Sequence, residues 1–337
     1  MNQPNPMDPA PLLELRGVSK RFVKSLDSAA RIANLFGARV QEETVHAVDD
    51  VTLSIAAGEV VGLVGESGCG KSTLGRMAVG LHSLSAGTRW WKSEEIDKLT
   101  PPQRRKKQLG IQMIFQDPYA SLNPRMRVID IVGEAPVAHG MVAAGQQSAY
   151  VEALLQRVGL DPAVLRRFPH QFSGGQRARV GIARALAVHP QFLVCDEAVA
   201  ALDVSIQAQV LNLFMKLRDE LNLTYLFISH DLGVVRHLSD RVAIMYLGRL
   251  IESAPADEVF ARPNHPYTLA LLASAPRLEV KKIEFLAVKG EIPSPLQPPT
   301  GCHFHPRCPH AMARCKEEKP ALREIASAHF SACHLNG

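Results

Sequence analysis

GESGCGKST, residues 65–73, decides how the rest of the chain is interpreted. The stretch satisfies the pattern G-x-x-x-x-G-K-S/T, which is typical of loops that bind phosphate. Four constrained positions match by chance in roughly one chain of this length in a hundred, so the neighbouring sequence has to support the interpretation. Residues 59–64, EVVGLV, are a short β-branched run typical of a buried strand, and residues 71–78, KSTLGRMA, read as the start of a helix.

A glycine loop between a strand and a helix N-terminus directs backbone N–H groups and the positive end of the helix dipole towards an anion. We therefore predict a site for ATP and Mg²⁺, in which Lys71 reaches the β- and γ-phosphates, Ser72 offers its hydroxyl to Mg²⁺ and Thr73 bonds the α-phosphate. The alternative is a glycine-rich turn that only connects a strand to a helix. The loop residues expected to bind the nucleotide are Gly65, Glu66, Ser67, Gly68, Cys69, Gly70, Lys71, Ser72 and Thr73.

Acidic residues follow a second predicted strand, residues 192–195, FLVC. Ligands of open α/β sheets bind at the carboxyl ends of parallel strands, so Asp196 is expected to hold Mg²⁺ and Glu197 to act as the general base on the attacking water. The alternative is an acidic pair at the protein surface. A third β-rich run, residues 223–228, precedes His230, which is able to donate a hydrogen bond to the γ-phosphate.

A second phosphate-seeking helix start lies in FSGGQ, residues 172–176, which opens a helix predicted to continue to about Val188. Ser173 and Gln176 form a capping box, and the two glycines allow a ligand to approach the helix N-terminus closely. One protomer needs only one such site. The second makes sense if it covers the γ-phosphate bound by a partner protomer, with two ATP molecules in a head-to-tail dimer.

The composition is that of a globular protein with one large and one smaller domain: 337 residues, 46% hydrophobic and 21% charged. No apolar run approaches the roughly 20 residues of a membrane-spanning helix, and the N-terminus MNQPNPMDPAP lacks a signal-peptide pattern, so a cytoplasmic chain is expected. The net charge of +5 is a mild excess, and the basic run at residues 104–107 is expected to be a solvated face rather than a nucleic-acid patch.

Taken together, GESGCGKST, FSGGQ, FLVCDE, ALD at residues 201–203 and ISHD, in this order, resemble the motifs of ATP-binding subunits of ABC transporters over nearly the whole chain. Residues 113–126 and 203–221 resemble the branch that serves oligopeptide and dipeptide importers. The resemblance implies an α/β fold with a RecA-like P-loop core, an antiparallel β subdomain and a helical subdomain. It also implies ATP hydrolysis that powers peptide import, with nickel, glutathione or another small solute as the alternative cargo. A soluble ABC ATPase acting on DNA or ribosomes is the alternative from another class.

The same resemblance assigns roles to matching residues. Gln116 would contact Mg²⁺ or the attacking water and link the nucleotide to the membrane subunits. Phe22 would stack on adenine, with packing in the core as the alternative. Two positions depart from the family pattern, Ala198 in place of a usual proline and Ala200 in place of a common serine, and hydrolysis is expected to survive both. The remaining assignments are Ser173, Gly175 and Gln176 acting on the partner's ATP, Asp203 at the dimer seam and His230 as γ-phosphate sensor.

The expected partners are a second ABC ATPase subunit, which is a related but non-identical chain, two transmembrane permease subunits and, indirectly, a solute-binding protein, without nucleic acid. The expected location is peripheral, on the cytoplasmic face of the cell membrane.

Domain boundaries follow from the motif positions. Residues 11–262 are expected to form the nucleotide-binding domain, with a helical subdomain at about residues 117–189, and residues 263–337 form a C-terminal extension that includes a proline-rich connector. We call residues 263–337 the extension below.

The extension contains four of the six cysteines, and clustered thiols in a cytosolic chain indicate a metal more often than disulfides. Four thiolates suit a 4Fe-4S cluster or zinc, nearby histidines offer alternative ligands, and a site without metal is also open. The resemblance favours the 4Fe-4S cluster, and a redox or metal sensor is a further alternative function. The four candidate ligands are Cys302, Cys308, Cys315 and Cys333; Cys69 and Cys195 are expected to be packing or loop residues.

Overall fold

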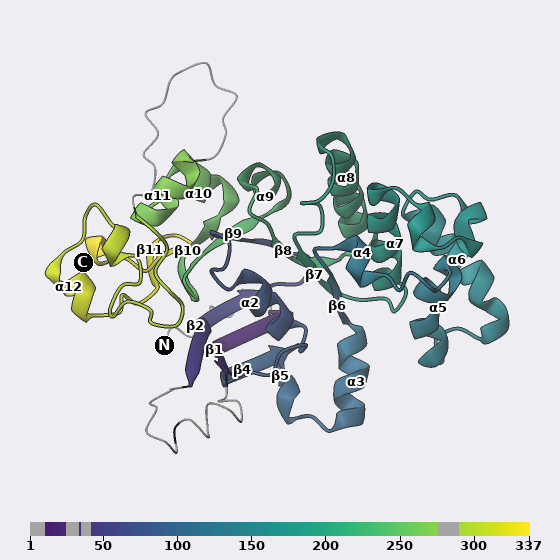
Figure 1. Ribbon diagram of the computed structural model, residues 1–337, viewed down its shortest axis with the longest axis horizontal. Helices are drawn as coiled ribbons and strands as arrows, with labels where there is room; N and C mark the ends of the chain where they lie inside the picture. Colours follow the sequence, from purple (N-terminus) through teal and green to yellow (C-terminus); the bar gives the residue numbers. More distant parts are fainter. Residues whose placement is uncertain (1–10, 25–33, 35–41, 275–289) are drawn as a thin grey trace.

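An eight-stranded sheet forms the centre of the molecule (Figure 1). The computed structural model describes residues 11–24, 34, 42–274 and 290–337. The strand order is β11-β12-β10-β9-β3-β8-β7-β6, and the segment from β9 to β6 is parallel. Every residue of β3, β7 and β8 is buried, as expected for parallel strands covered on both faces. The strands of the described core are β3 (Val60–Val64), β6 (Ile111–Ile114), β7 (Phe192–Asp196), β8 (Thr224–Ile228), β9 (Arg241–Tyr246) and β10 (Arg249–Pro255).

A second, antiparallel sheet of four strands lies beside α2 (Figure 1). Leu13, Leu15 and Ile55 from this sheet share one buried cluster with Leu63 of β3 and Leu74 of α2, so α2 is packed between the two sheets. The elements are β1 (Leu13–Lys24), β2 (Glu43–Ile55), β4 (Ala86–Trp91), β5 (Glu94–Glu95) and α2 (Lys71–Ala78).

A helical region lies at the β6 end of the central sheet (Figure 1). It contains α4 (Pro118–Ser121), α5 (Val128–Ala138), α6 (Gln147–Arg157) and α7 (Gly174–Leu186). The helix α7 ends two residues before the predicted end at Val188. It packs on α8 (Val204–Leu221), whose apolar stripe is buried at Val210, Phe214 and Leu217 and half-buried at Leu221.

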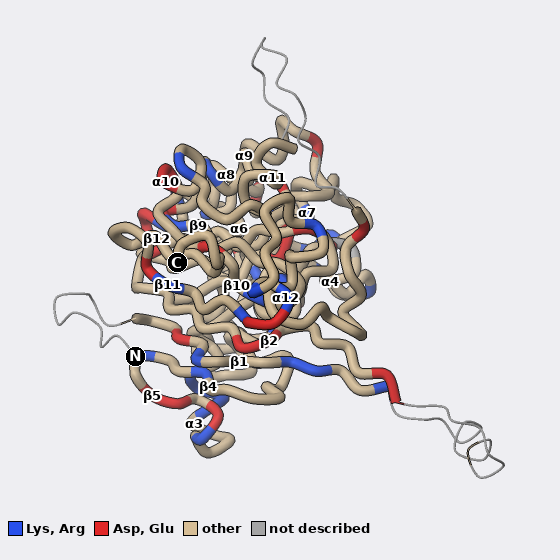
Figure 2. The backbone as a smooth tube through the Cα atoms, turned by 90° about the vertical axis from the view of Figure 1, so that its left-hand side faces the viewer, with Lys and Arg blue, Asp and Glu red and all other residues tan. Residues whose placement is uncertain are grey.

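The basic run at residues 104–107 lies on α3 (Pro101–Leu109), which has no buried residue. Acidic residues accompany it (Figure 2), and Lys107 forms an ion pair of 2.7 Å with Glu94. This arrangement agrees with a solvated face.

The extension is joined to the central sheet, which the sequence did not indicate. The strand β12 (His329–Ser331) pairs antiparallel with β10, and β11 (Arg323–Ala326) pairs with β12. The helices on this side are α9 (Leu232–Leu238), α10 (Ala256–Ala261), α11 (Pro266–Ala273) and α12 (Ala313–Glu317). The extension therefore contributes two strands to the sheet of the nucleotide-binding domain and is not a separate appendage.

Candidate active site

The loop between β3 and α2 borders a cavity of about 620 Å³. Predicted residues from this loop, from β1 and from the segments that follow β6, β7 and β8 line the cavity, together with residues of β2 and of the extension. Gly65, Glu66 and Cys69 of the loop and Asp196 of β7 do not line it. The residues that line it are Phe22, Val45, Ala47, Ser67, Gly68, Gly70, Lys71, Ser72, Thr73, Gln116, Glu197, His230 and Pro295.

The conformation of the loop explains its glycines. Gly70 has φ of 105°, and a Cβ at this position would lie 2.1 Å from the backbone oxygen of Ala47, so no larger residue fits. The ammonium of the buried Lys71 donates to the carbonyl oxygens of Gly65 at 2.7 Å and Glu66 at 2.9 Å. The loop thus holds a buried cation beside the helix N-terminus, which is the arrangement that an anion requires.

Ser72 and Asp196 form a donor set that fits Mg²⁺. The hydroxyl of Ser72 donates to Oδ1 of Asp196 at 2.8 Å, and Asp196 is the buried last residue of β7. Burial raises the pKa of the Asp196 carboxyl, and the hydrogen bond from Ser72 opposes this rise. A hard cation that keeps several waters and binds one or two carboxylates together with phosphates suits this pair.

Two side chains, those of Gln116 and His230, converge on Glu197. Nε2 of Gln116 donates to Oε2 of Glu197 at 2.7 Å, and Nδ1 of His230 lies 3.4 Å from Oε1. The three residues follow the neighbouring strands β6, β7 and β8. The carboxylate of Glu197 is therefore oriented from one side by an amide and has an imidazole on the other.

Phe22 lies at the wall of the same cavity. Its side chain is 39% exposed and its ring meets His82 edge-on, with 5.4 Å between centroids. Packing in the core, the alternative interpretation of Phe22, is wrong because the ring is at the surface.

The helix start at FSGGQ does not reach this cavity within the same chain. Ser173 accepts from the backbone N–H of Gln176 at 3.3 Å, and the Gln176 side chain accepts from the N–H of Ser173 at 3.1 Å, so the predicted capping box is present. Neither these residues nor Gly175 or Asp203 line the cavity. Their expected role on a partner's nucleotide stays a prediction.

The cysteines of the extension do not fit a metal site. In the part of the chain that the structure describes, no group of three or more His, Cys, Asp or Glu side chains is placed to hold a metal ion. Burial raises the pKa of Cys302 to about 11 and also raises the pKa of Cys308 and Cys333, so these thiols are protonated at neutral pH in the absence of a metal. The predicted 4Fe-4S cluster at Cys302, Cys308, Cys315 and Cys333, and equally zinc, is therefore not supported.

Three residues of the extension near the phosphate loop were not predicted from the sequence. Pro295 lines the cavity, and Arg307 and Tyr267 both bond to Glu66. No motif marks them, because their partners lie far away along the chain.

Comparison with known proteins decides the family. Residues 48–200 match the ABC transporter family, and residues 251–315 match the C-terminal region of oligopeptide/dipeptide transporters. The oligopeptide transport ATP-binding protein AppF of Bacillus subtilis is 50% identical over 330 residues, which is 96% of this chain and 97% of the relative. The chain belongs to the ATP-binding proteins of ABC transporters.

Other relatives of this ABC ATPase agree. A putative peptide import ATP-binding protein of Brucella ovis is 43% identical and covers 97% of the chain and 98% of its own length. A dimeric ATP-binding cassette, MJ0796, solved in a post-hydrolysis state with ADP and phosphate, superposes with a TM-score of 0.61 at 26% identity and covers 72% of this chain and 98% of the cassette. The predicted α/β ABC ATPase fold with its antiparallel β sheet and helical region is confirmed. Among the described helices of this ABC ATPase, none is both long and apolar enough to cross a membrane.

Proposed function

We propose that this chain is the ATP-hydrolysing subunit that powers import of di- and oligopeptides by an ABC transporter. The match to the C-terminal region of oligopeptide/dipeptide transporters and the peptide-transport names of the relatives support peptides as cargo. Nickel, glutathione and other small solutes are the competing cargoes, and they are distinguished by the uptake experiment below.

The observation that carries the proposal is the convergence of Gln116, Glu197 and His230 at the cavity that the phosphate loop borders. Glu197 accepts a proton from the attacking water, whose oxygen bonds the γ-phosphorus as the bond to the β,γ-bridging oxygen breaks and ADP leaves. Gln116 orients the Glu197 carboxylate, and His230 donates to the γ-phosphate oxygens. Lys71 neutralises charge on the β- and γ-phosphates.

Ser72 and Asp196 would hold Mg²⁺, and the Gln116 amide lines the same cavity as Ser72. The ion would supply charge neutralisation of the phosphates when it is bound. Phe22 offers a ring face for adenine from β1, because its side chain is exposed at the cavity wall. His82 packs edge-on against the same ring.

The FSGGQ residues Ser173, Gly175 and Gln176, with Asp203 at the seam, would complete a second chain's site in a head-to-tail dimer. Their position outside the cavity of their own chain supports this arrangement. The partner would be a related ATPase subunit, and both would dock on two permease subunits at the cytoplasmic face of the membrane. Extracellular peptide would come from a solute-binding protein.

The Glu197→Gln variant tests the chemistry. The replacement keeps the shape and the hydrogen bond with Gln116 but removes the base, so turnover of ATP should fall at least about 100-fold while the midpoint of thermal unfolding and ATP binding stay near wild type. Glu220→Gln on the exposed end of α8 is the matched control and should hydrolyse normally. Unchanged turnover in E197Q would contradict the assigned base.

Uptake into vesicles tests the cargo. The chain is assembled with its permeases, and labelled di- and oligopeptides are compared with nickel and glutathione, each with wild type and with E197Q. Peptide uptake that depends on Glu197 is expected. ATP-dependent uptake of only nickel or glutathione would replace the peptide assignment.

A further inference from the structure

The extension holds the phosphate loop at Glu66. Nη1 of Arg307 lies 2.8 Å from Oε2 of Glu66, and Nη2 lies 3.1 Å from Oε1, so the guanidinium bonds both carboxylate oxygens. The hydroxyl of Tyr267 accepts from the backbone N–H of Glu66 at 2.9 Å. Both the side chain and the backbone of one loop residue are therefore fixed by the extension.

The residues that hold Glu66 are themselves fixed by packing. Tyr267 is fully buried, and its ring lies 4.7 Å from that of Tyr246 and 5.5 Å from that of Phe304. The Arg307 guanidinium lies over the Tyr246 ring at 5.8 Å, and only 5% of the Arg307 side chain is exposed. A bidentate pair with this little exposure has one well-defined geometry.

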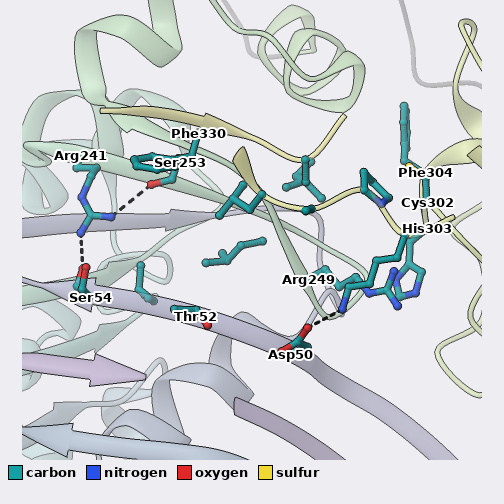
Figure 3. Close-up of a pocket in the computed structure, with 18 residues that line it drawn as sticks. Asp50, Thr52, Ser54, Arg241, Arg249, Ser253, Cys302, His303, Phe304 and Phe330 are labelled. Atoms are coloured by element: carbon teal, nitrogen blue, oxygen red, sulfur yellow. Dashed lines mark hydrogen bonds and ion pairs between the residues drawn. The ribbon is translucent and has the colours of Figure 1, made fainter. Parts of the chain in front are cut away.

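Segment 301–304, just before Arg307, is bonded to the strand pair β9–β10. His303 Nδ1 donates to the carbonyl of Leu247 at 2.8 Å, and Arg249 Nη1 donates to the carbonyl of Gly301 at 2.9 Å. Figure 3 shows Cys302, His303 and Phe304 at one end of a neighbouring cavity of about 470 Å³, close to Arg249 and Asp50. The segment that carries Arg307 is thus anchored to the central sheet.

The position of Glu66 matters because its carbonyl holds Lys71. The Lys71 ammonium donates to Glu66 O at 2.9 Å, so a shift of Glu66 moves the group that has to meet the phosphates. The extension reaches the cavity itself at Pro295, whose carbonyl accepts from the N–H of His46 at 3.0 Å.

We infer that the extension is an integral part of the nucleotide site and that Arg307 is a positioning residue, which acts through Glu66 on Lys71. The inference rests on the proposed function only in taking ATP as the ligand of the loop, and it does not depend on the cargo. Pro295 supplies part of the cavity wall beside this contact.

A double-mutant cycle on the full-length chain tests the inference. Affinity for MgATP is measured by titration calorimetry in the E197Q background, and kcat, KM and the thermal midpoint are measured with Glu197 intact. R307M and E66Q should each weaken ATP binding at least about tenfold, because a charge-assisted bidentate pair is broken. R307K should lose less, since lysine keeps the charge without the fork.

The double variant E66Q/R307M should bind ATP no more weakly than the worse single variant, because both changes remove the same contact. The control is R314M, which breaks an exposed ion pair with Glu318 on α12 of the same extension and should leave affinity unchanged.

Three results would overturn the inference: affinity within about twofold of wild type in E66Q, additive losses in the double variant, or losses that only follow the unfolded fraction. E66Q keeps the test decisive if R307M does not fold. If the wild-type chain binds ATP but the transporter assembled with it takes up no peptide, the result counts against the proposed cargo and not against this inference.

Discussion

Glu197 is held in a backbone conformation that residues with a side chain rarely adopt. Its φ is 47°, and such a conformation costs on the order of 1–3 kcal/mol and persists only where the surrounding structure holds it. Here the N–H of Glu197 donates to the carbonyl of Ile228 at 2.9 Å, and its side chain accepts from Gln116. The bend directs the carboxylate towards the cavity at the point where β7 ends.

His265 gives the protein a pH-dependent stability. Burial lowers the pKa of His265 to about 4, whereas a histidine in the unfolded chain has its ordinary pKa of about 6.5. Between these two values the unfolded state binds a proton that the folded state does not bind. The stabilisation is complete above about pH 6.5 and is lost as the pH falls towards 4, with about 2 kcal/mol gone at pH 5. His265→Asn keeps the acceptor for the N–H of Tyr267 at the start of α11, so its midpoint should fall less between pH 7 and 5.

The measurement is the midpoint of thermal unfolding at both pH values. His310→Asn replaces an exposed histidine and should behave as wild type. An H265N midpoint that drops as steeply as that of wild type would show that other groups govern the acid sensitivity. His303, whose pKa burial also lowers to about 4, would then be the next residue to replace.

At the scale of elements, α7 and α8 are in tight contact at Gly175. A Cβ on Gly175 would lie 2.4 Å from Cγ2 of Ile206, whereas a Cβ on Gly181 of the same helix would meet no atom within 4 Å. Gly175→Ala should therefore destabilise the protein by about 1–3 kcal/mol through overpacking. Gly181→Ala should stabilise it by about 0.5–1 kcal/mol, because alanine favours helix interiors over glycine. Thermal unfolding of both variants checks the pair.

The contact itself is tested by adding Ile206→Ala to Gly175→Ala. Removal of Cγ2 should restore part of the lost stability, since the two changes act on one contact. If Gly175→Ala costs the same stability in the wild-type and in the Ile206→Ala background, the strain does not lie in the contact between residues 175 and 206.

Elements with a strong local pattern could be predicted from the sequence. The strand β3 and the helix α2 lie where the apolar run and the glycine loop indicated. The strand is buried over its whole length and the helix along one face, so both have a strong hydrophobic pattern. The strands β11 and β12 could not be predicted. They are short, and β11 exposes nearly all of its side chains, so strand pairing, of β12 with β10 and of β11 with β12, determines them and not a hydrophobic pattern.

The same distinction holds for the site. Lys71, Ser72, Asp196 and Glu197 lie in or beside local motifs, and the sheet order brings them together. Arg307 and Glu66 are 241 residues apart, and neither has a local pattern that names its partner. Only the docking of the extension on the sheet creates that contact.

At the scale of the whole molecule, Glu252 fastens the extension to the sheet. Its fully buried carboxylate accepts from His329 Nε2 on β12 at 2.8 Å and from the N–H groups of Asn264 and His265, each at 2.8 Å. His329→Leu leaves this carboxylate one donor short, at a cost of about 3 kcal/mol. Because the extension is continuous with the central sheet, we expect one cooperative unfolding transition at a lower temperature.

Scanning calorimetry with and without ATP measures this effect. His329→Gln retains a donor and should lose less, and His334→Leu, outside the sheet, should lose little. A small early transition that leaves the ATP-sensitive transition at its wild-type temperature would mean that the extension unfolds by itself.

The position of β12 in the chain also matters during synthesis. The strand β10 leaves the ribosome long before β12, so its outer edge stays unpaired and the carboxylate of Glu252 lacks His329 throughout that interval. An unpaired edge is a template for pairing with another chain. The nascent ATPase therefore has an unpaired sheet edge after its nucleotide motifs have been made, and the extension is the segment that pairs it.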